Sequence, residues 1–246
     1  MPTPESAPSG AVEEPAGVYV HIPFCSAICP YCDFAVTVGD AAARRRLVEA
    51  LAAEAGRTGA EFGRPVDTVY WGGGTPSLLA LSELEPIALA LDHHLELVPG
   101  TRHFLEANPE DVDTDRLETW RDLGVGTLSL GVQALDAAAL EFLGRRHSAE
   151  QGRRAVELAL AAGFGTVSID LIYGRPGQSV DEWRRELDAA VDLGVDHLSC
   201  YQLTLEPGTP FGRRAARGEL AAPPPDLEAD LFFATHEHLA EPRFEA

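Results

Sequence analysis

The stretch Thr166-Val-Ser-Ile-Asp-Leu-Ile-Tyr173 is rich in β-branched and apolar residues and predicts a strand. Residues 180–193 follow as a predicted helix, which ends in Leu193-Gly194, and residues 197–203 are a second apolar run. Glycine directly after a helix suits the left-handed C-cap conformation. A strand, a helix and another strand in this order indicate a unit whose two strands are parallel.

The same alternation extends through the chain. We predict further strands at residues 17–22, 66–71, 102–107 and 127–132, and further helices at residues 40–62, 82–97, 113–123, 149–162 and 226–240. Leu123-Gly124 and Ala162-Gly163 repeat the glycine helix end. Asp40 and Ser82 are the expected N-caps, with Glu85 completing a capping box. Six β/α units predict an α/β fold, a partial (β/α)6 TIM-like barrel of parallel strands, although periodicity alone leaves a doubly wound sheet open.

Composition restricts the class of protein. The chain has 246 residues, which suits one large α/β domain, and its formal net charge is −20. An acidic surface repels phosphate backbones, so we expect no nucleic-acid partner. No apolar run approaches about 18 residues, which argues against a membrane span. Because the N-terminus also lacks the basic start and apolar stretch of a signal peptide, we predict a cytoplasmic protein.

The two ends of the chain differ from its centre. Residues 1–16 contain many Pro, Ser, Ala and Glu residues, and we predict a disordered leader there. Pro223-Pro-Pro225 is the clearest linker, and it separates a core at residues 17–222 from residues 223–246. The chain stops at Ala246 without a clear closing element, so we interpret residues 223–246 as the start of a truncated C-terminal region.

Three of the four cysteines lie on one predicted loop, in the sequence His21-Ile-Pro-Phe-Cys-Ser-Ala-Ile-Cys-Pro-Tyr-Cys-Asp-Phe34. Cys25, Cys29 and Cys32 do not form a disulfide framework, and clustered thiols in such a chain favour metal or redox chemistry. Soft thiolates select iron–sulfur clusters, zinc or copper(I). A four-iron cluster normally takes four cysteine ligands, so a loop with three leaves one iron open to a reacting ligand.

A structural zinc site is the alternative, with a fourth ligand such as Cys200 or His21. Zinc sites usually combine two ligand pairs, and this loop shows no such pairing, so the iron–sulfur cluster is favoured. We interpret Cys200 as a small core residue, because free cysteine is commonly buried. The histidines on predicted helices are interpreted as solvated side chains: His93, His94, His236 and His238.

The C-x3-C-x2-C spacing, with an aromatic residue before the last cysteine, resembles the signature of the radical SAM superfamily. The resemblance implies that Cys25, Cys29 and Cys32 hold a [4Fe–4S] cluster and that residues 17–222 form a radical SAM core. It also implies that S-adenosylmethionine (SAM) chelates the fourth iron and is cleaved by an electron from the cluster to a 5′-deoxyadenosyl radical. The cofactor carries this chemistry, and the protein positions it.

Further residues at the ends of the predicted strands match the superfamily's SAM site. Trp71-Gly-Gly-Gly-Thr-Pro76 resembles the loop that contacts the methionine amino group. The resemblance implies that Asp170 accepts hydrogen bonds from ribose hydroxyls and that Arg145 pairs with the methionine carboxylate. His147 is a weaker candidate. The expected SAM-binding residues are Tyr19, Tyr31, Gly73, Gly74, Thr75, Glu106, Gln133, Arg145 and Asp170.

Within the superfamily, the chain resembles HemW-type heme chaperones and their relatives, the oxygen-independent coproporphyrinogen III dehydrogenases. The dehydrogenases typically have a cysteine two residues after the third, where this chain has Phe34. Two further stretches resemble HemW: Asp170-Leu-Ile-Tyr-Gly-Arg-Pro-Gly-Gln178 and Tyr201-Gln-Leu-Thr-Leu-Glu-Pro-Gly-Thr209. This resemblance implies a heme or porphyrin ligand, a heme-accepting protein and an electron donor. Oxidative decarboxylation of coproporphyrinogen III and another radical SAM reaction, such as methyl transfer, are the alternatives.

Overall fold

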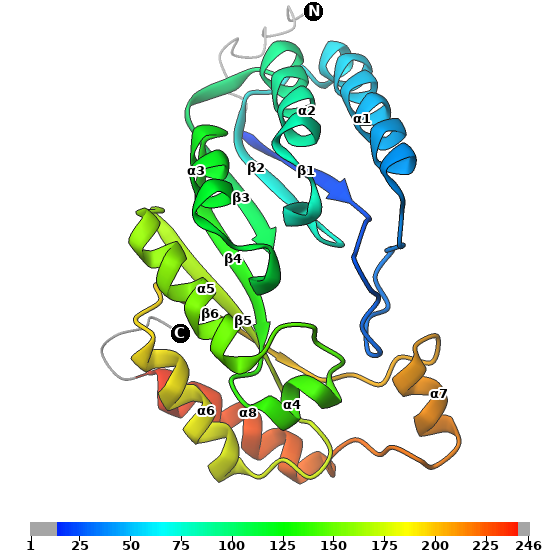
Figure 1. The fold of residues 1–246 in the computed structure, drawn as a ribbon, viewed down its shortest axis with the longest axis vertical. Helices are drawn as coiled ribbons and strands as arrows, with labels where there is room; N and C mark the ends of the chain where they lie inside the picture. The colour runs from blue at the N-terminus through cyan, green and yellow to red at the C-terminus, as the bar shows by residue number, and fades with distance from the viewer. Residues whose placement is uncertain (1–13, 241–246) are drawn as a thin grey trace, which may run out of the picture.

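The computed structural model describes residues 14–240 and contains one six-stranded parallel sheet. Its strands are β1 (Ala16–Ile22), β2 (Val66–Gly73), β3 (Leu97–Ala107), β4 (Val125–Gln133), β5 (Thr166–Tyr173) and β6 (His197–Gln202). They lie side by side in the order of the sequence, as Figure 1 shows. An order without reversal winds in one direction, which excludes a doubly wound sheet. The predicted partial TIM-like barrel of parallel strands is therefore confirmed.

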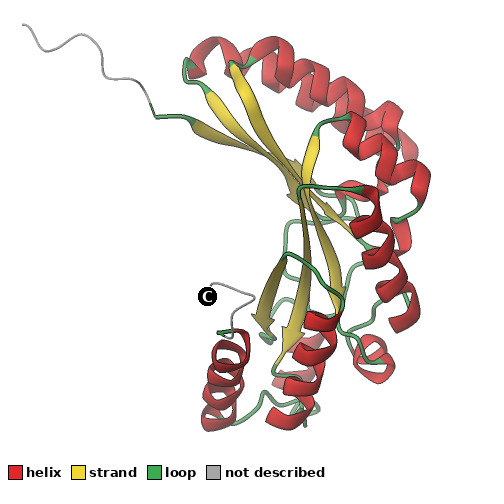
Figure 2. Ribbon diagram, turned by 90° about the vertical axis from the view of Figure 1, so that its left-hand side faces the viewer, coloured by secondary structure: helices red, strands yellow, loops and turns green. Residues whose placement is uncertain are grey.

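Helices cover one side of this sheet. Figure 2 shows the sheet curved, with most helices against its convex face and the concave face open. The α-helices are α1 (Ala41–Phe62), α2 (Leu81–His94), α3 (Thr114–Asp122), α4 (Ala137–Phe142), α5 (Ala149–Ala162), α6 (Val180–Asp192), α7 (Pro210–Ala216) and α8 (Pro225–Leu239). Two short 3-10 helices, η1 (Pro76–Leu78) and η2 (Pro109–Asp111), follow β2 and β3.

The hydrophobic core lies between the sheet and these helices. Strand residues Ile22, Leu128 and Ile169 have no exposed surface, and neither do Trp183 and Leu187 of α6. Full burial of one large apolar side chain contributes about 1.5–3 kcal/mol relative to its exposure. The convex face of the sheet thus provides the main attachment of the helices.

Most predicted helix ends agree with the structure. Asp40 caps α1, because its carboxylate accepts a hydrogen bond of 2.8 Å from the backbone N–H of Ala43. Gly124, Gly163 and Gly194 follow their helices with φ angles of 84°, 77° and 74°. These angles lie in the left-handed region that glycine adopts without a steric penalty.

The predicted start of α2 is wrong. The helix begins at Leu81 with Ala80 as its N-cap, so Ser82 already lies in the first turn. Glu83 accepts a hydrogen bond of 2.9 Å from the backbone N–H of Ala80. The same side chain forms an ion pair of 3.0 Å with Arg44 of α1. Glu83 thus caps the start of α2 and also joins α2 to α1.

Other observed element boundaries also differ from the predicted ones. Helix α2 ends at His94, and Leu97 already pairs with Val66 as the first residue of β3. The predictions omitted α4 and α7, whose six and seven residues are too few to display a helical period. Strand β1 includes Ala16, so the predicted leader is one residue too long. Residues 1–13 of that leader lie outside the described residues, as do residues 241–246.

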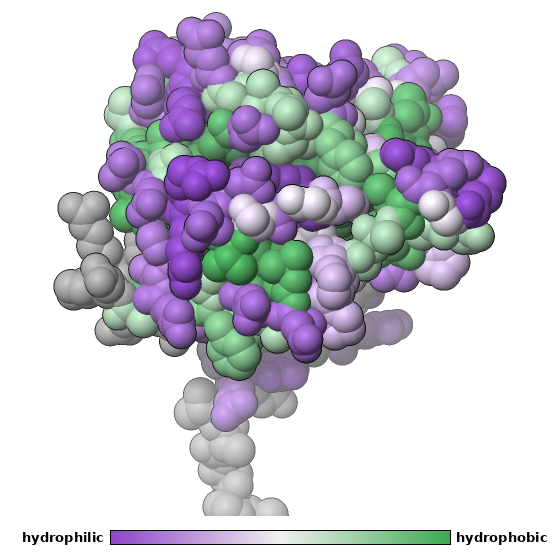
Figure 3. Space-filling model, turned by 90° about the horizontal axis from the view of Figure 1, so that it is seen from below, coloured by the Kyte–Doolittle hydropathy of each residue, from purple (hydrophilic) through white to green (hydrophobic). Residues whose placement is uncertain are grey.

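The surface of the described part of the chain carries both hydrophilic and apolar side chains. Between residues 14 and 240 no helix combines the length and the apolar character that a membrane crossing requires. Some large apolar side chains are exposed, including Phe34 at 71% and Phe233 at 59%. Figure 3 shows the molecule from below, where hydrophobic patches lie among hydrophilic residues.

Helix α8, which follows the predicted linker, packs against α6. The indole N–H of Trp183 donates a hydrogen bond of 2.7 Å to Thr235 Oγ1, and both side chains are buried. Residues 223–240 are therefore attached to the core through a specific polar contact. The proposed division of the chain at residue 222 stays a prediction.

We expect Thr235→Val to lower the free energy of unfolding by about 1–3 kcal/mol, because it leaves a buried indole N–H without an acceptor. Urea unfolding followed by tryptophan fluorescence measures this change. The matched variant Trp183→Phe and the double variant complete a mutant cycle. If the free energy of unfolding lost in the double variant equals the sum of the two single losses, the hydrogen bond does not couple α6 to α8.

Candidate functional site

A cavity of about 380 Å³ lies at the carboxyl ends of the strands, where parallel barrels bind their ligands. The loop after β1 forms one wall, and the segments at and after the ends of β2 to β6 form the others. All predicted site residues except Tyr19 line this cavity: Cys25, Cys29, Tyr31, Cys32, Gly73, Gly74, Thr75, Glu106, Gln133, Arg145 and Asp170. Parallel topology thus brings together side chains that lie far apart in sequence.

Tyr19 lies outside the lining. It sits three residues before the end of β1, is 56% exposed, and stacks on Tyr70 with ring centroids 5.6 Å apart. Its hydroxyl nevertheless lies against the glycine loop, because a Cβ on Gly72 would come within 2.7 Å of it. Tyr19 therefore supports the loop from the concave face of the sheet.

The three thiols lie on a loop whose base is closed by backbone hydrogen bonds. The N–H of Cys25 donates to Thr37 O at 2.9 Å, and the N–H of Cys32 donates to Cys29 O at 3.1 Å. All three cysteines are free and partly exposed. Burial raises the pKa of the Cys25 and Cys32 thiols, so metal binding would have to displace their protons.

The glycine loop packs closely against the start of the cysteine loop. The N–H of Gly74 donates a hydrogen bond of 2.7 Å to Ile22 O. A Cβ on Gly74 would lie 2.8 Å from the carbonyl oxygens of Pro23 and Phe24. Only glycine permits this approach, so the sequence Gly72-Gly-Gly74 holds the two loops in contact.

Two carboxylates lie at the floor of the cavity. Glu106 of β3 accepts hydrogen bonds from Tyr70 Oη at 2.9 Å and from the backbone N–H of Gly73 at 3.1 Å. Asp170 of β5 accepts one from Ser129 Oγ at 3.2 Å. Loss of solvent raises the pKa of Glu106 and raises that of Asp170 to about 6. Both groups can accept hydrogen bonds from a ligand.

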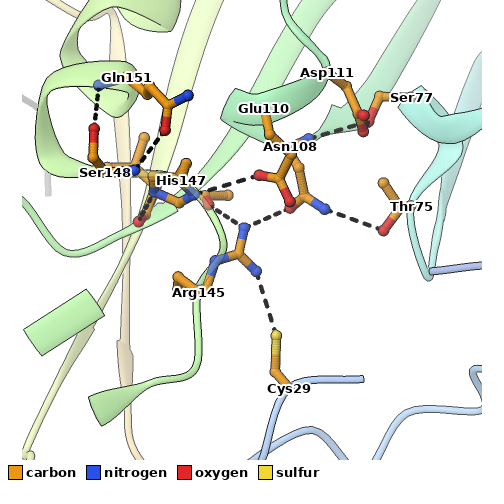
Figure 4. Close-up of polar contacts among 12 residues, drawn as sticks. Cys29, Thr75, Ser77, Asn108, Glu110, Asp111, Arg145, His147, Ser148 and Gln151 are labelled. Atoms are coloured by element: carbon orange, nitrogen blue, oxygen red, sulfur yellow. Dashed lines mark hydrogen bonds and ion pairs between the residues drawn. The ribbon is translucent and has the colours of Figure 1, made fainter. Parts of the chain in front are cut away.

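Arg145 brings a positive charge to the same cavity, as Figure 4 shows. Its Nη2 donates to Asn108 Oδ1 at 2.6 Å and to Gly131 O at 2.8 Å, and its Nη1 donates to Cys29 Sγ at 3.5 Å. None of these partners is a carboxylate, and Nε is buried without a partner among the described residues. The guanidinium can therefore pair with an anionic group of a ligand.

Gln133 reaches the cavity through an unusual backbone conformation. Its φ angle is 66°, and in the described chain it is the one residue other than glycine with a positive φ. Such strain costs about 1–3 kcal/mol and is concentrated at functional sites. The local sequence contains no signal for this conformation.

Sequence reasoning did not include some lining residues. Asn108, Ser129 and Tyr201 also face the cavity. Asn108 directly follows β3 in the sequence Leu105-Glu-Ala-Asn-Pro109, so its position after a strand was an available signal. Ser129 and Tyr201 lie inside their strands, and the strand register places them on the same face of the sheet as Glu106 and Asp170.

The other candidate residues have ordinary positions. Cys200 packs against the hydrophobic core as predicted, and burial raises its pKa to about 12. His93, His94 and His236 are exposed as predicted, whereas His238 is partly buried and pairs with Asp188. Residues 14–240 contain no group of three His, Cys, Asp or Glu side chains placed to hold one metal ion.

We expect Asp170→Asn to remove a pH-dependent part of the stability of the cofactor-free protein. A carboxyl with a raised pKa stabilises the fold at low pH, and this contribution is lost as pH rises from about 4 to about 6. Relative to that of the wild type, the free energy of unfolding of the variant should rise by about 2–3 kcal/mol over that pH range. Urea unfolding at several pH values measures this gain, with Asp122→Asn on the exposed surface of α3 as control. Parallel pH profiles for the wild type and Asp170→Asn would contradict the expectation.

Comparison with known proteins identifies relatives of this chain. Two heme chaperones named HemW match the chain: that of Mycobacterium tuberculosis is 43% identical over 224 residues and that of Escherichia coli is 36% identical over 227 residues. These matches cover 89% and 92% of this chain. The chain spans 57% and 59% of the length of these two relatives.

A solved structure and a family profile extend the comparison. The structure of coproporphyrinogen III oxidase (HemN) from Escherichia coli, a radical SAM enzyme, superposes with a TM-score of 0.82 and 27% sequence identity. The match covers 95% of this chain and 54% of that chain. The profile of the radical SAM superfamily matches residues 19–199. These residues include the cysteine loop and the carboxyl ends of β1 to β5. The chain belongs to the radical SAM superfamily.

Proposed function

We propose that this chain binds a [4Fe–4S] cluster on Cys25, Cys29 and Cys32, binds SAM in the adjoining cavity, and forms the core of a HemW-type heme chaperone. One observation carries the cofactor proposal. The three thiols line the same cavity as a cation without a carboxylate partner, two carboxylates and a glycine loop. SAM carries a carboxylate, an amino group and ribose hydroxyls, and each of these finds a complementary group there.

The donor set fits the cluster. Thiolates are the usual ligands of iron–sulfur clusters, and three of them leave one iron for another ligand. The hydrogen bonds from Thr75 Oγ1 to Cys25 Sγ and from Arg145 to Cys29 Sγ, each 3.5 Å, would stabilise negative charge on the sulfurs. When bound, the cluster and SAM supply one-electron radical chemistry.

The remaining residues would orient SAM. Arg145 would pair with its carboxylate, and the glycine loop would face its amino group. Asp170 would accept hydrogen bonds from the ribose, since Ser129 occupies only part of its acceptor capacity. Ionisation of Asp170 is favoured by such donors and opposed by burial. The chain would thus hold SAM by polar contacts from three segments that lie far apart in sequence.

Similarity to HemW proteins supports the chaperone part of the proposal. So does Phe34, which is 71% exposed and lines the cavity at the position where the dehydrogenases typically have a further cysteine. Heme binding, a heme-accepting partner protein, an electron donor and a cytoplasmic location are parts of the same proposal.

Oxidative decarboxylation of coproporphyrinogen III is the second candidate. Its support is the TM-score of 0.82 to coproporphyrinogen III oxidase, over 95% of this chain. The two candidates share the cluster and the SAM site, so only the fate of the tetrapyrrole separates them.

We expect alanine at Cys25, Cys29 or Cys32 to abolish the cluster, because each substitution removes one of three thiolate ligands. Iron and sulfide analysis of the anaerobically reconstituted protein measures this loss, together with the cluster absorbance. Cys200→Ala is the matched control and should keep the full iron content, because this thiol packs against the core. Full iron and sulfide in Cys29→Ala would refute the ligand assignment.

We expect the reconstituted wild-type protein to bind heme and to form no protoporphyrinogen from coproporphyrinogen III, SAM and a reductant. A heme titration followed at the Soret band and a product assay by chromatography make these two measurements. The protein should include any further C-terminal residues that its gene encodes. Product formation would identify an oxygen-independent coproporphyrinogen III dehydrogenase despite Phe34.

A further inference from the structure

His147 is a buried polar residue to which the proposed function gives no role. Only 3% of its surface is exposed, and it does not line the cavity. It lies two residues after Arg145, on the short segment between α4 and α5. Burial of an imidazole is unfavourable unless its nitrogens are paired, so the contacts of this ring require explanation.

Both ring nitrogens contact segments that lead into the cavity, as Figure 4 shows. Nε2 lies 3.1 Å from the carbonyl oxygen of Val132, near the end of β4. Nδ1 lies 3.4 Å from Glu110 Oε2, on η2 after β3. The carbonyl can only accept, so Nε2 donates to Val132 O, whereas Nδ1 faces the Glu110 carboxylate without a hydrogen bond among the described residues. The contact with His147 holds the pKa of Glu110 below its ordinary value although burial opposes this.

The contact with Val132 bears directly on Gln133. The Val132 carbonyl belongs to the peptide bond that leads into Gln133, whose φ angle is 66°. The same carbonyl accepts a hydrogen bond of 2.8 Å from the N–H of Ala134. Two donors therefore fix the orientation of this peptide plane. The strained conformation that turns Gln133 into the cavity depends on that orientation.

The segment that carries Arg145 is anchored by hydrogen bonds at both of its ends. On one side, the N–H of Arg145 donates to Leu140 O of α4 at 2.9 Å. On the other, Ser148 caps α5 and exchanges hydrogen bonds of 3.1 Å and 2.8 Å with Gln151. Between these anchors, His147 attaches the segment to the ends of β3 and β4. The guanidinium bonds to Asn108 and Gly131 at those same strand ends.

We propose that His147 is a positioning residue for the cavity ligand: by donating to Val132 O and contacting Glu110, it holds Gln133 and Arg145 in the orientations that contact SAM. This inference rests on the proposed function, since it assumes that SAM is the ligand. His147 itself makes no contact with SAM and acts through these two residues.

The test uses two amide variants that differ by one methylene. In His147→Gln the amide nitrogen lies near the position of Nε2 and keeps the hydrogen bond to Val132 O. In His147→Asn the amide is too short to reach that carbonyl. We expect SAM affinity, measured by calorimetry on the cluster-containing protein, to fall about tenfold in His147→Asn and to stay close to the wild-type value in His147→Gln.

Two controls separate positioning from general damage. Iron content and the melting temperature show whether each variant retains the cluster and the fold. His103→Gln alters a partly buried histidine of β3 whose Nδ1 has no partner among the described residues, and it should leave the SAM affinity unchanged. The SAM-induced change in the electron paramagnetic resonance signal of the reduced cluster reports the geometry of the bound ligand. This change should be altered in His147→Asn and normal in His147→Gln.

Each outcome decides the proposal. Wild-type affinity and an unaltered resonance signal in His147→Asn would overturn it, and so would an equal loss in both amide variants. If His147→Asn does not fold, Glu110→Gln tests the other contact, and it should weaken SAM binding with the cluster retained. Unchanged SAM affinity in Glu110→Gln would then overturn the proposal. Absence of SAM binding by the wild-type protein would instead refute the proposed function.

Discussion

All six strands of this protein run in the same direction, and this constraint determines where chemistry can occur. Parallel strands bring every carboxyl end to one edge of the sheet. The loop after β1 supplies thiols, the loop after β2 supplies glycines, and β3, β4 and β5 supply carboxylate and amide groups. Helices separate each of these elements from the next in the sequence. The cavity exists because the topology makes them neighbours in space.

Within that cavity, polar groups are buried with incomplete pairing. Arg145 donates to neutral groups and a thiol, and loss of solvent raises the pKa of Glu106 and Asp170. Buried charges without partners are costly unless something compensates them. The proposed SAM ligand carries a carboxylate and hydroxyl groups, which would compensate Arg145 and Asp170.

The geometry around these groups is maintained by close backbone packing. Gly74 lets β2 approach the start of the cysteine loop, and a Cβ there would clash with two carbonyl oxygens. Gln133 adopts a left-handed conformation beside a carbonyl that two donors hold in place. Both features fix atoms at the rim of the cavity before a ligand arrives, so less ordering is required on binding.

The sequence by itself determined the alternation of strands and helices, the thiol loop and a set of site residues, all of which except Tyr19 line the cavity. These features are local: apolar periodicity, the spacing of Cys25, Cys29 and Cys32, and polar residues placed directly after strands. Tertiary structure decided the rest. Glu83, which caps α2, also pairs with Arg44 of α1, and Tyr19 stacks on Tyr70 of the neighbouring strand outside the cavity. The contacts of Asn108 with Arg145 and of His147 with Val132 join residues 37 and 15 positions apart, so only the fold reveals them.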